Sequence, residues 1–499
     1  MTPSNNPNDR LQHFLGQGTS DLRDFIVGNI VNANNHELTR IEQYFLYWKF
    51  YNGKHYRDVN HSLIQFNYIK AFINKTIQFL LGKNAFTFEV KSLYTDIVDE
   101  QLTKPIEEYI MYQWNRNGKA VKAHEILQTG SVAGDAWILT YWDPAVKFVR
   151  IRVLDSRQCF PIFKDGDTSK LESFQLRMQL ENNPNGYKLR VVNYTKDTIE
   201  TWYQKSTVIL KPKANFLGKI DGNVENFTTE KNMVGFIPIV HIKNKPQADS
   251  YFGVSDAHDI LNLNKVFNEM YQEMKGIIDY HATPVTVVTG ATLKGMTRSL
   301  GKIWSGLPPE ANVFTLGLDA DLGSMITFLD RLKQGMHEIS DVPENVLGKI
   351  QAISGTSAAA LQLTYQPLVQ QADTKALTYG EGIADINENM LRIGKIYDPN
   401  NVRLQGIDMS ETESELRVLP VFSYGFPTDR LNILQEGQFE FQMNIGSKRE
   451  LMNRLGKNNV EALMLEIENE RIAEAKIERQ IEDIVGVPTT NTTTTPPVQ

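Results

Sequence analysis

The chain has 499 residues, which is too long for one hydrophobic core, so we expect two or more structural regions. Its composition, 41% hydrophobic and 22% charged, is that of a folded protein, and no stretch approaches the roughly 20 uninterrupted apolar residues of a membrane span. The net charge of −7 argues against a domain that grips nucleic acid over its whole surface, because such domains are usually basic.

The first half of the chain predicts helices followed by antiparallel strands, which indicates the α+β fold class. Helices are expected at about residues 22–55, 67–81, 96–115 and 120–133. Strands are expected at 86–90, 136–142, 148–154, 174–180, 188–195, 198–203 and 238–243. Gly53 and Gly82 stand where the first two helices should stop, since glycine readily takes the left-handed conformation of a helix end.

Two long amphipathic helices dominate the middle of the chain. In the first, at 255–281, the apolar stripe is Ile260, Leu263, Phe267, Met270, Met274, Ile277 and His281. In the second, at 318–342, it is Leu322, Ile326, Leu329, Leu332, Met336 and Ile339, and Pro343 ends the helix. A short β segment at 284–290 lies between them. Neither helix can cover its stripe alone, so we expect copies of the chain to stand side by side in a ring.

A segment of small residues, 354–360, follows the hairpin and begins a helix that runs towards Tyr397, with a kink expected at Pro367. Strands are expected at 402–407 and 415–422, followed by a charged helical region at 428–485. The last fourteen residues are rich in threonine and proline and cannot form a packed core, so we expect disorder there.

Motifs of common catalytic sites do not occur in the sequence. Gly290-Ala-Thr-Leu-Lys-Gly295 lacks the spacing that cradles phosphates, which argues against an ATPase. The Asp319-Ala-Asp321 pair stands where a helix begins, so carboxylates favoured by the helix dipole explain it better than a metal site. The single cysteine, Cys159, excludes an intrachain disulfide and is expected to be a buried, inert thiol. We therefore predict no catalytic residues, no metal site and no cofactor.

Charge along the hairpin alternates in sign. The two helical segments carry Asp256, Asp259, Glu269, Glu273, Asp279, Asp319, Asp321, Asp330, Glu338, Asp341 and Glu344, against Lys265, Lys275, Arg331 and Lys333. The segment 282–317 is basic, with Lys294, Arg298 and Lys302, and the hinge at 345–356 has one charge, Lys349. In a monomer these would be solvated helix faces and a basic loop. In a ring, acidic walls with sparse basic belts would guide a polyanion without holding it.

Several segments, in their order along the chain, carry a resemblance to a known family. They are Tyr47-Trp-Lys-Phe-Tyr-Asn-Gly-Lys-His-Tyr56, Asn67-Tyr-Ile-Lys70 with Ile77-Gln-Phe-Leu-Leu-Gly-Lys83, Ile237-Pro-Ile-Val-His-Ile-Lys243 before Gly253-Val-Ser-Asp256, and the hairpin with Ser354-Gly-Thr-Ser-Ala-Ala-Ala-Leu361. Together, over about residues 40–485, they resemble the portal proteins of tailed bacteriophages, in particular the SPP1 Gp6-like group.

The resemblance implies a portal fold assembled as a ring. It would comprise a mobile N-terminal arm at 1–21, an α/β wing at 22–254, a stem helix at 255–281, a small α/β clip at 282–317, a second stem helix at 318–342, a tunnel loop at 343–356, a tunnel helix with the return to the wing at 357–430, an α-helical crown at 431–485 and a disordered tail at 486–499.

The resemblance also implies a ring of about twelve subunits at one vertex of the capsid, through which double-stranded DNA is packaged and later ejected. The protein would lie in the virion, and in the host cytoplasm during assembly. Its partners would be the terminase large subunit, which supplies ATP hydrolysis, a head-completion or adaptor protein, and the major capsid and scaffolding proteins, with no membrane contact.

The same resemblance suggests which residues serve these contacts. The tunnel loop would present Gly348, Lys349, Ile350, Gln351, Ser354 and Gly355 to the DNA. Lys349 is the first candidate for a DNA-backbone contact, followed by Lys333 and Arg331 in the channel. The residues Lys294, Arg298, Lys302 and Trp304 would dock the terminase or the adaptor, although the three basic ones could instead meet acidic groups of a neighbouring subunit.

Two alternatives remain open at this point. One is an oligomeric capsid scaffold or adaptor without DNA passage, in which Lys349 has no role. The other is a carboxylate-dependent hydrolase that uses Asp319 and Asp321. The small residues near 354–360 fit close approach to a symmetry axis, but they also fit an ordinary helix contact inside one subunit.

Overall fold

The computed structural model describes residues 35–54, 64–92, 100–164, 167–168, 171–180, 185–205, 224–248, 250–282, 285–290, 308–316, 322–347, 363–401, 416–425, 430–443, 446–455 and 460–485. The chain divides into two compact units, Met1–Gly425 and Phe426–Gln499. The arm at 1–21, the strand at 402–407 and the tail at 486–499, all predicted from the sequence, lie outside the described residues.

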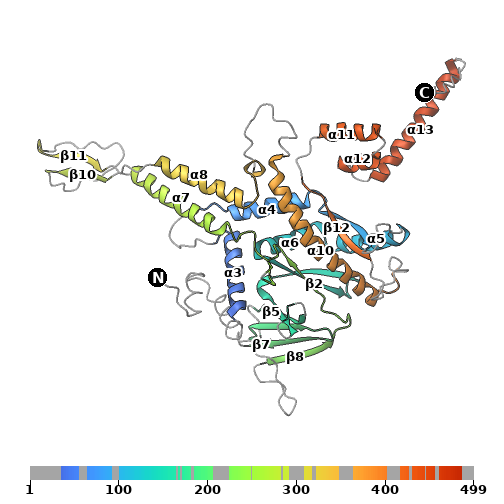
Figure 1. Ribbon diagram of the computed structural model, residues 1–499, viewed down its shortest axis with the longest axis horizontal. Helices are drawn as coiled ribbons and strands as arrows, with labels where there is room; N and C mark the ends of the chain where they lie inside the picture. The colour runs from blue at the N-terminus through green and yellow to red at the C-terminus, as the bar shows by residue number, and fades with distance from the viewer. Residues whose placement is uncertain are drawn as a thin grey trace, which may run out of the picture. The chain divides into compact units, whose positions relative to one another are not determined.

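The first unit begins with the helices and strands that the sequence predicted, which confirms a mixed α+β composition (Figure 1). The helices are α3 (Asn35–Tyr51), α4 (Tyr68–Leu81), α5 (Glu100–Arg116) and α6 (Lys119–Ala133), and strand β1 (Phe86–Ser92) follows α4. The side chain of Asn67 caps α4 by accepting a hydrogen bond from the backbone N–H of Lys70 at 3.0 Å. The predicted stripe of α4, from Ile69 to Leu80, is buried.

Gly53 and Gly82 both have positive φ at the ends of the first two described helices, as predicted. At Gly82, with φ +52°, a Cβ atom would lie 2.0 Å from the carbonyl oxygen of Ser423. Glycine is therefore required there twice, for its conformation and for the close approach of the chain beside β12 (Leu416–Phe422).

Among the described residues, antiparallel strands form three sheets in this unit besides the small sheet between the hairpin helices. Strands β2 (Asp135–Asp143), β3 (Phe148–Leu154) and β9 (Ile239–Lys243) form one sheet with β2 in the centre. A five-stranded meander consists of β4 (Cys159–Phe163), β5 (Leu171–Gln179), β6 (Leu189–Tyr194), β7 (Thr198–Gln204) and β8 (Val224–Lys231). In the third sheet β1 pairs with β12.

Two of these strands, β4 and β8, were not predicted from the sequence. The first contains Pro161, which cannot donate to a ladder, and the second is the polar sequence Val-Glu-Asn-Phe-Thr-Thr-Glu-Lys. Neither has the regular apolar alternation that marks a half-buried strand.

The longest helix of the unit, α10 (Gln366–Tyr397), contacts α4, α5, β2, β9 and β12. A kink was predicted at Pro367, but this residue stands in the first turn of α10, where the missing N–H of proline is harmless, and the helix is not kinked there. The interruption comes instead at Tyr365, which separates α10 from residues 363–364. Gly382 lets α10 lie directly on β9, since a Cβ there would be 2.3 Å from Ile242.

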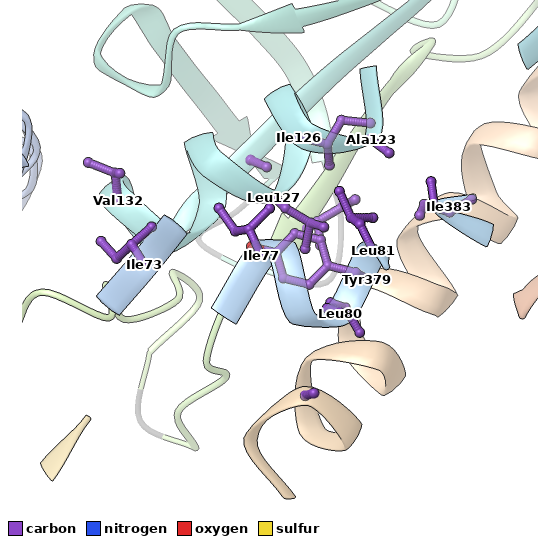
Figure 2. Packing of buried hydrophobic residues seen from close by; sticks show 14 of the residues in the cluster. Ile73, Ile77, Leu80, Leu81, Ala123, Ile126, Leu127, Val132, Tyr379 and Ile383 are labelled. Atoms are coloured by element: carbon purple, nitrogen blue, oxygen red, sulfur yellow. The ribbon is translucent and has the colours of Figure 1, made fainter. Parts of the chain in front are cut away.

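The main core lies among α4, α6 and α10 (Figure 2). Tyr379 of α10 lies between Ile77 of α4 and Leu127 of α6 in this view. Nearby, the indole N–H of Trp114 donates to the side-chain carbonyl of Asn387 at 2.7 Å, and the amide of Asn387 donates to the backbone oxygen of Val418 at 2.9 Å. These polar bonds fix the position of α10 against α5 and β12.

A second, smaller core joins the three-stranded sheet to the meander. It contains Trp137, Leu154, Cys159 and Phe174. Cys159 is fully buried, as predicted, and burial raises the pKa of its thiol well above the ordinary value.

The second unit is helical, as predicted for 428–485. It consists of α11 (Arg430–Gln442), α12 (Lys448–Arg454) and α13 (Val460–Val485). Gly437 allows α11 and α12 to approach closely, because a Cβ at this position would lie 2.3 Å from the side chain of Leu451.

Candidate nucleic-acid interface

The predicted hairpin consists of α7 (Leu261–Ala282) and α8 (Leu322–Ile339), which lie side by side (Figure 1). Both helices are shorter than predicted. Residues 256–260 form turns, in which the hydroxyl of Ser255 donates to the carbonyl oxygen of Val132 and accepts from the backbone N–H of Ala257, and Asp256 pairs with Lys375. At the other end α8 stops at Ile339, before Asp341 takes a positive φ of 54°.

A short antiparallel sheet joins the two helices. The β segment at 284–290 is β10 (Val285–Thr289), and it pairs with β11 (Asn312–Leu316), a strand that was not predicted. The described turn residue Gly290 has φ +78°, and a Cβ there would lie 2.6 Å from the backbone oxygen of Glu310. Val313 and Phe314 of β11 are more than 40% exposed.

The part of the hairpin nearest the body is buried in the main core. Phe267 and Met274 of α7 and Leu329 and Met336 of α8 belong to the same apolar cluster as the α4 stripe. Asn268 strengthens this attachment, because its side chain accepts a hydrogen bond from the backbone N–H of Phe66 at 2.7 Å and donates to its carbonyl at 3.1 Å. The hairpin is thus anchored at one end by apolar contacts and backbone hydrogen bonds.

Other apolar residues of the hairpin are half exposed. The exposed fraction is 49% for Ile278, 52% for Ile326, 46% for Phe328 and 48% for Ile339. Ile326 and Ile339 belong to the predicted apolar stripe of the second helix, which the single chain was expected to leave partly uncovered. A single chain therefore leaves an apolar surface on both helices, which we call the hairpin surface and define by these four residues.

The acidic residues of the hairpin are mostly exposed. Both lysines of α7 pair with an acid one turn further on, Lys265 with Glu269 at 3.9 Å and Lys275 with Asp279 at 2.6 Å. Exposed pairs of this kind contribute about 0–1 kcal/mol to stability. They remove the free positive charge of α7, so the remaining acids keep its surface negative. Asp256 is an exception, since its side chain is 9% exposed and lies inside the body.

The two predicted channel cations of α8 differ in their surroundings. Lys333 is directed towards the 3₁₀ turn η3 (Glu344–Leu347), where its Nζ lies 3.3 Å from Oε1 of Glu344. Arg331 is exposed, and its guanidinium reaches Gln334 at 3.5 Å. Among the described residues no carboxylate pairs with Arg331, whereas Lys333 has Glu344 as its partner.

His337 fixes the exit from α8. The ring is buried and packs edge-on against Phe72 with their centroids 5.0 Å apart. Its Nδ1 lies 2.7 Å from the carbonyl oxygen of Val342, which can only accept, so Nδ1 carries the proton. Nε2 lies 3.9 Å from Glu344. His337 is thus a packing residue at the point where the chain leaves the hairpin.

Most of the residues proposed from the resemblance lie outside the described part of the chain. These are Gly348, Lys349, Ile350, Gln351, Ser354 and Gly355 of the expected tunnel loop, and Lys294, Arg298, Lys302 and Trp304 of the expected clip. The chain on either side is described. Asn345 of η3 donates a hydrogen bond to the hydroxyl of Thr364, so residues 345 and 364 lie together.

The described residues bear on two features, a cluster of metal-binding side chains and a helix that could span a membrane. They contain no group of three or more histidine, cysteine, aspartate or glutamate side chains that could hold a metal ion. Asp319 and Asp321, the carboxylates of the hydrolase alternative, lie outside the described ranges. No described helix is long and apolar enough to cross a membrane.

One polar cluster beside the hairpin was not predicted. Lys375 of α10 is 1% exposed, and its Nζ lies 2.7 Å from Oδ2 of Asp256 and 3.0 Å from the hydroxyl of Ser131. It also donates to the side-chain oxygen of Asn244. The sequence signal that could have revealed it is the spacing of Gln371, Lys375 and Tyr379, which places three polar groups on the inner face of a buried helix.

Comparison with known proteins adds a family match. A family model described as "Phage portal protein, SPP1 Gp6-like" matches residues 28–481. Among solved structures, one chain from the virion of a native gene transfer agent (GTA) particle is similar, with 11% sequence identity, a TM-score of 0.42, and coverage of 88% of this chain and 98% of that chain. A search of curated proteins gave no match. The family match extends over both compact units.

Proposed function

Because the chain belongs to the SPP1 Gp6-like family of phage portal proteins, a family of structural proteins of the phage virion, we propose that identical copies close into a ring through which double-stranded DNA enters and leaves the capsid. A ring of about twelve copies at one vertex fits the closed symmetry of homo-oligomers. The hairpin would be the stem, the β10–β11 sheet part of the clip, α10 the tunnel helix and the second unit the crown.

The observation that best supports the proposed ring is the exposed hairpin surface. Ile278 lies on α7, and Ile326, Phe328 and Ile339 lie on α8, each about half exposed in the single chain. Burial of apolar area contributes about 25 cal/mol per Å², so a neighbouring hairpin would gain stability by covering these side chains. In a ring, α7 of each copy would contact one neighbour and α8 would contact the other. The apolar residues of the hairpin surface would then be covered on both helices.

The charge of the hairpin supports passage of DNA. Tight neutralisation of phosphates would add affinity and slow movement, since each contact releases counterions and adds to the binding free energy. Paired lysines on α7 and exposed acids on both helices avoid this. Sparse cations, Arg331 in the channel and Lys349 in the tunnel loop, would centre the duplex. The terminase and the adaptor would dock at the clip through Lys294, Arg298, Lys302 and Trp304.

The assembly can be tested on purified full-length protein by negative-stain imaging and mass photometry. We expect rings of about twelve subunits with a central hole for the unaltered chain. Phe328→Glu should lower the ring fraction at least about tenfold, because a charge would be buried at the contact. The control is Met233→Glu, at an apolar residue 59% exposed outside the hairpin, which should leave the rings intact. A compact single-chain particle at high concentration would rule out the ring.

The DNA role is tested separately through Lys349. We expect Lys349→Ala, and more strongly Lys349→Glu, to lower the amount of DNA packaged or retained per particle while rings still form. If both variants package and retain DNA normally, Lys349 has no part in the tunnel loop. Rings that assemble into capsids but never admit DNA would favour the scaffold or adaptor function.

A further inference from the structure

One face of α10 contacts both ends of the hairpin. Gln371, Lys375 and Tyr379 follow one another at intervals of four residues, so their side chains lie along one side of the helix. Lys375 and Tyr379 are buried and Gln371 is partly buried. We call these three residues the α10 ladder. Polar side chains on a buried helix face are retained only where partners satisfy them.

Lys375 holds the chain where it enters α7. Its ammonium group donates to the hydroxyl of Ser131 and to the side-chain oxygen of Asn244, and it forms an ion pair with Asp256, whose Oδ2 lies 2.7 Å away. Asp256 in turn accepts from the side-chain amide of Asn244 at 2.9 Å and lies 3.5 Å from Nζ of Lys245. Asp256 stands five residues before the first residue of α7, so this ion pair fixes the start of the hairpin to α10.

The Asp256 carboxylate stays charged near neutral pH, because its pKa lies below the ordinary value. Burial by itself raises the pKa of Asp256, but Lys375 and Lys245 outweigh burial and hold that pKa below its ordinary value. Burial lowers the pKa of Lys375, and Asp256 offsets part of that effect. A buried ion of this kind is costly to leave without its partner.

Gln371 holds the chain where it leaves α8. Its side-chain amide donates to the carbonyl oxygen of Ser340 at 3.1 Å, one residue beyond the end of α8. Its side-chain oxygen accepts from the hydroxyl of Thr76 in α4 at 3.0 Å. Tyr379 completes the ladder by donating to the side-chain oxygen of Asn244 at 2.9 Å, the same oxygen that Lys375 contacts. Both legs of the hairpin are therefore attached to one helix.

We propose that the α10 ladder is a coupling element, in which Lys375 and Gln371 are positioning residues that make the hairpin and α10 move as one body. The role of this coupling in DNA passage rests on the proposed function: a displacement of the hairpin by the duplex or by a docked partner would be transmitted directly to α10. Separating the two would take Lys375 away from the buried Asp256 and leave Lys245, 3.5 Å away, as its remaining cation, so the separation is costly.

Hydrogen–deuterium exchange on the full chain tests the coupling. In Lys375→Met, amides of residues 255–260 should exchange at least about tenfold faster, because the start of the hairpin is released from α10. In Gln371→Ala, faster exchange should appear at 336–342 and not at 255–260. The control is Ile393→Ala, which removes a fully buried side chain from the far end of the same helix. It should lower thermal stability without changing exchange at either hairpin end.

The coupling is refuted if exchange at 255–260 is unchanged in Lys375→Met, or if it rises as much in Ile393→Ala at an equal loss of thermal stability. Should Lys375→Met fail to fold, Gln371→Ala decides alone, and unchanged exchange at 336–342 overturns the proposal. Rings and DNA packaging are measured separately in the unaltered chain. A chain that forms no ring but shows the expected exchange would disprove the proposed function and leave the coupling standing.

Discussion

Gly130→Ala tests how closely α6 and α10 are packed. A Cβ at Gly130 would lie 2.0 Å from the hydroxyl oxygen of Tyr379 and 3.0 Å from its Cζ. Tyr379 is fully buried, so the ring can move only by displacing its neighbours. Alanine in a helix interior is otherwise favoured over glycine by about 1 kcal/mol.

The clash outweighs that gain. Overpacking a core costs about 1–3 kcal/mol, and loss of the bond from Tyr379 to Asn244 leaves buried polar groups unsatisfied at a further cost of about 1–3 kcal/mol. We therefore expect a net destabilisation of about 1–5 kcal/mol after the helix gain is subtracted. Gly276→Ala is the matched control, because nothing lies within 4 Å of its added Cβ in the single chain. It should stabilise α7 by up to about 1 kcal/mol.

Tyr379→Phe supplies the decisive comparison. Alone it removes one hydrogen bond and should cost about 1 kcal/mol. Combined with Gly130→Ala it removes the oxygen that causes the clash, so the double variant should be more stable than Gly130→Ala. Tryptophan fluorescence during thermal or urea unfolding is a suitable assay, since all six tryptophans lie in the first unit. The steric argument would be refuted if the losses in unfolding free energy of the two single variants simply added in the double variant, or if the double variant were less stable than Gly130→Ala.

Two further predictions concern ionisable groups. The pKa of Asp256 is held below its ordinary value, so its contribution to stability is present above the unfolded pKa and lost as the pH falls below about 4. In Lys375→Met that pKa should be lowered less, because Lys245 and the Asn244 amide remain but Lys375 is gone, so this variant should lose less stability in thermal unfolding as the pH falls below about 4. Cys159 should resist a thiol-reactive dye in the native chain and react on unfolding, because it is buried and its pKa is raised. Rapid labelling of the native protein would contradict that burial.

The helices were the most predictable part of the fold, because their signals are local. The stripe of α4, its Asn67 cap and the stop at Gly82 can all be identified within sixteen consecutive residues. The hairpin was also predicted, but its ends were not. Residues 256–260 have a helical pattern, yet the partner that holds Asp256 in a turn is Lys375, which is 119 residues away. A contact between residues so far apart in the sequence produces no local pattern of apolar and polar residues from which it could be predicted.

The site was less predictable than the fold for the same reason. The spacing of Gln371, Lys375 and Tyr379 marks a polar face of the helix, but only the structure shows that Lys375 is buried among Ser131, Asn244 and Asp256. Lys333 looked free, but the turn after α8 brings Glu344 within 3.3 Å of it. The exposure of Ile326 and Ile339 could not be predicted from the spacing of apolar residues in α8. That spacing identifies the apolar face of the helix but not how much of the face α7 covers.

The pairing of β1 with β12 has a consequence for how the protein is made. Ser92 is opposite Leu416, so the partner of β1 is synthesised 324 residues later. At about 5–20 residues per second the ribosome needs roughly 20 to 60 seconds for that interval. Throughout it, β1, with Phe86 and Phe88, lacks its partner strand β12, a state that favours association with other nascent chains. Slow, cool expression should therefore raise the yield of soluble chain.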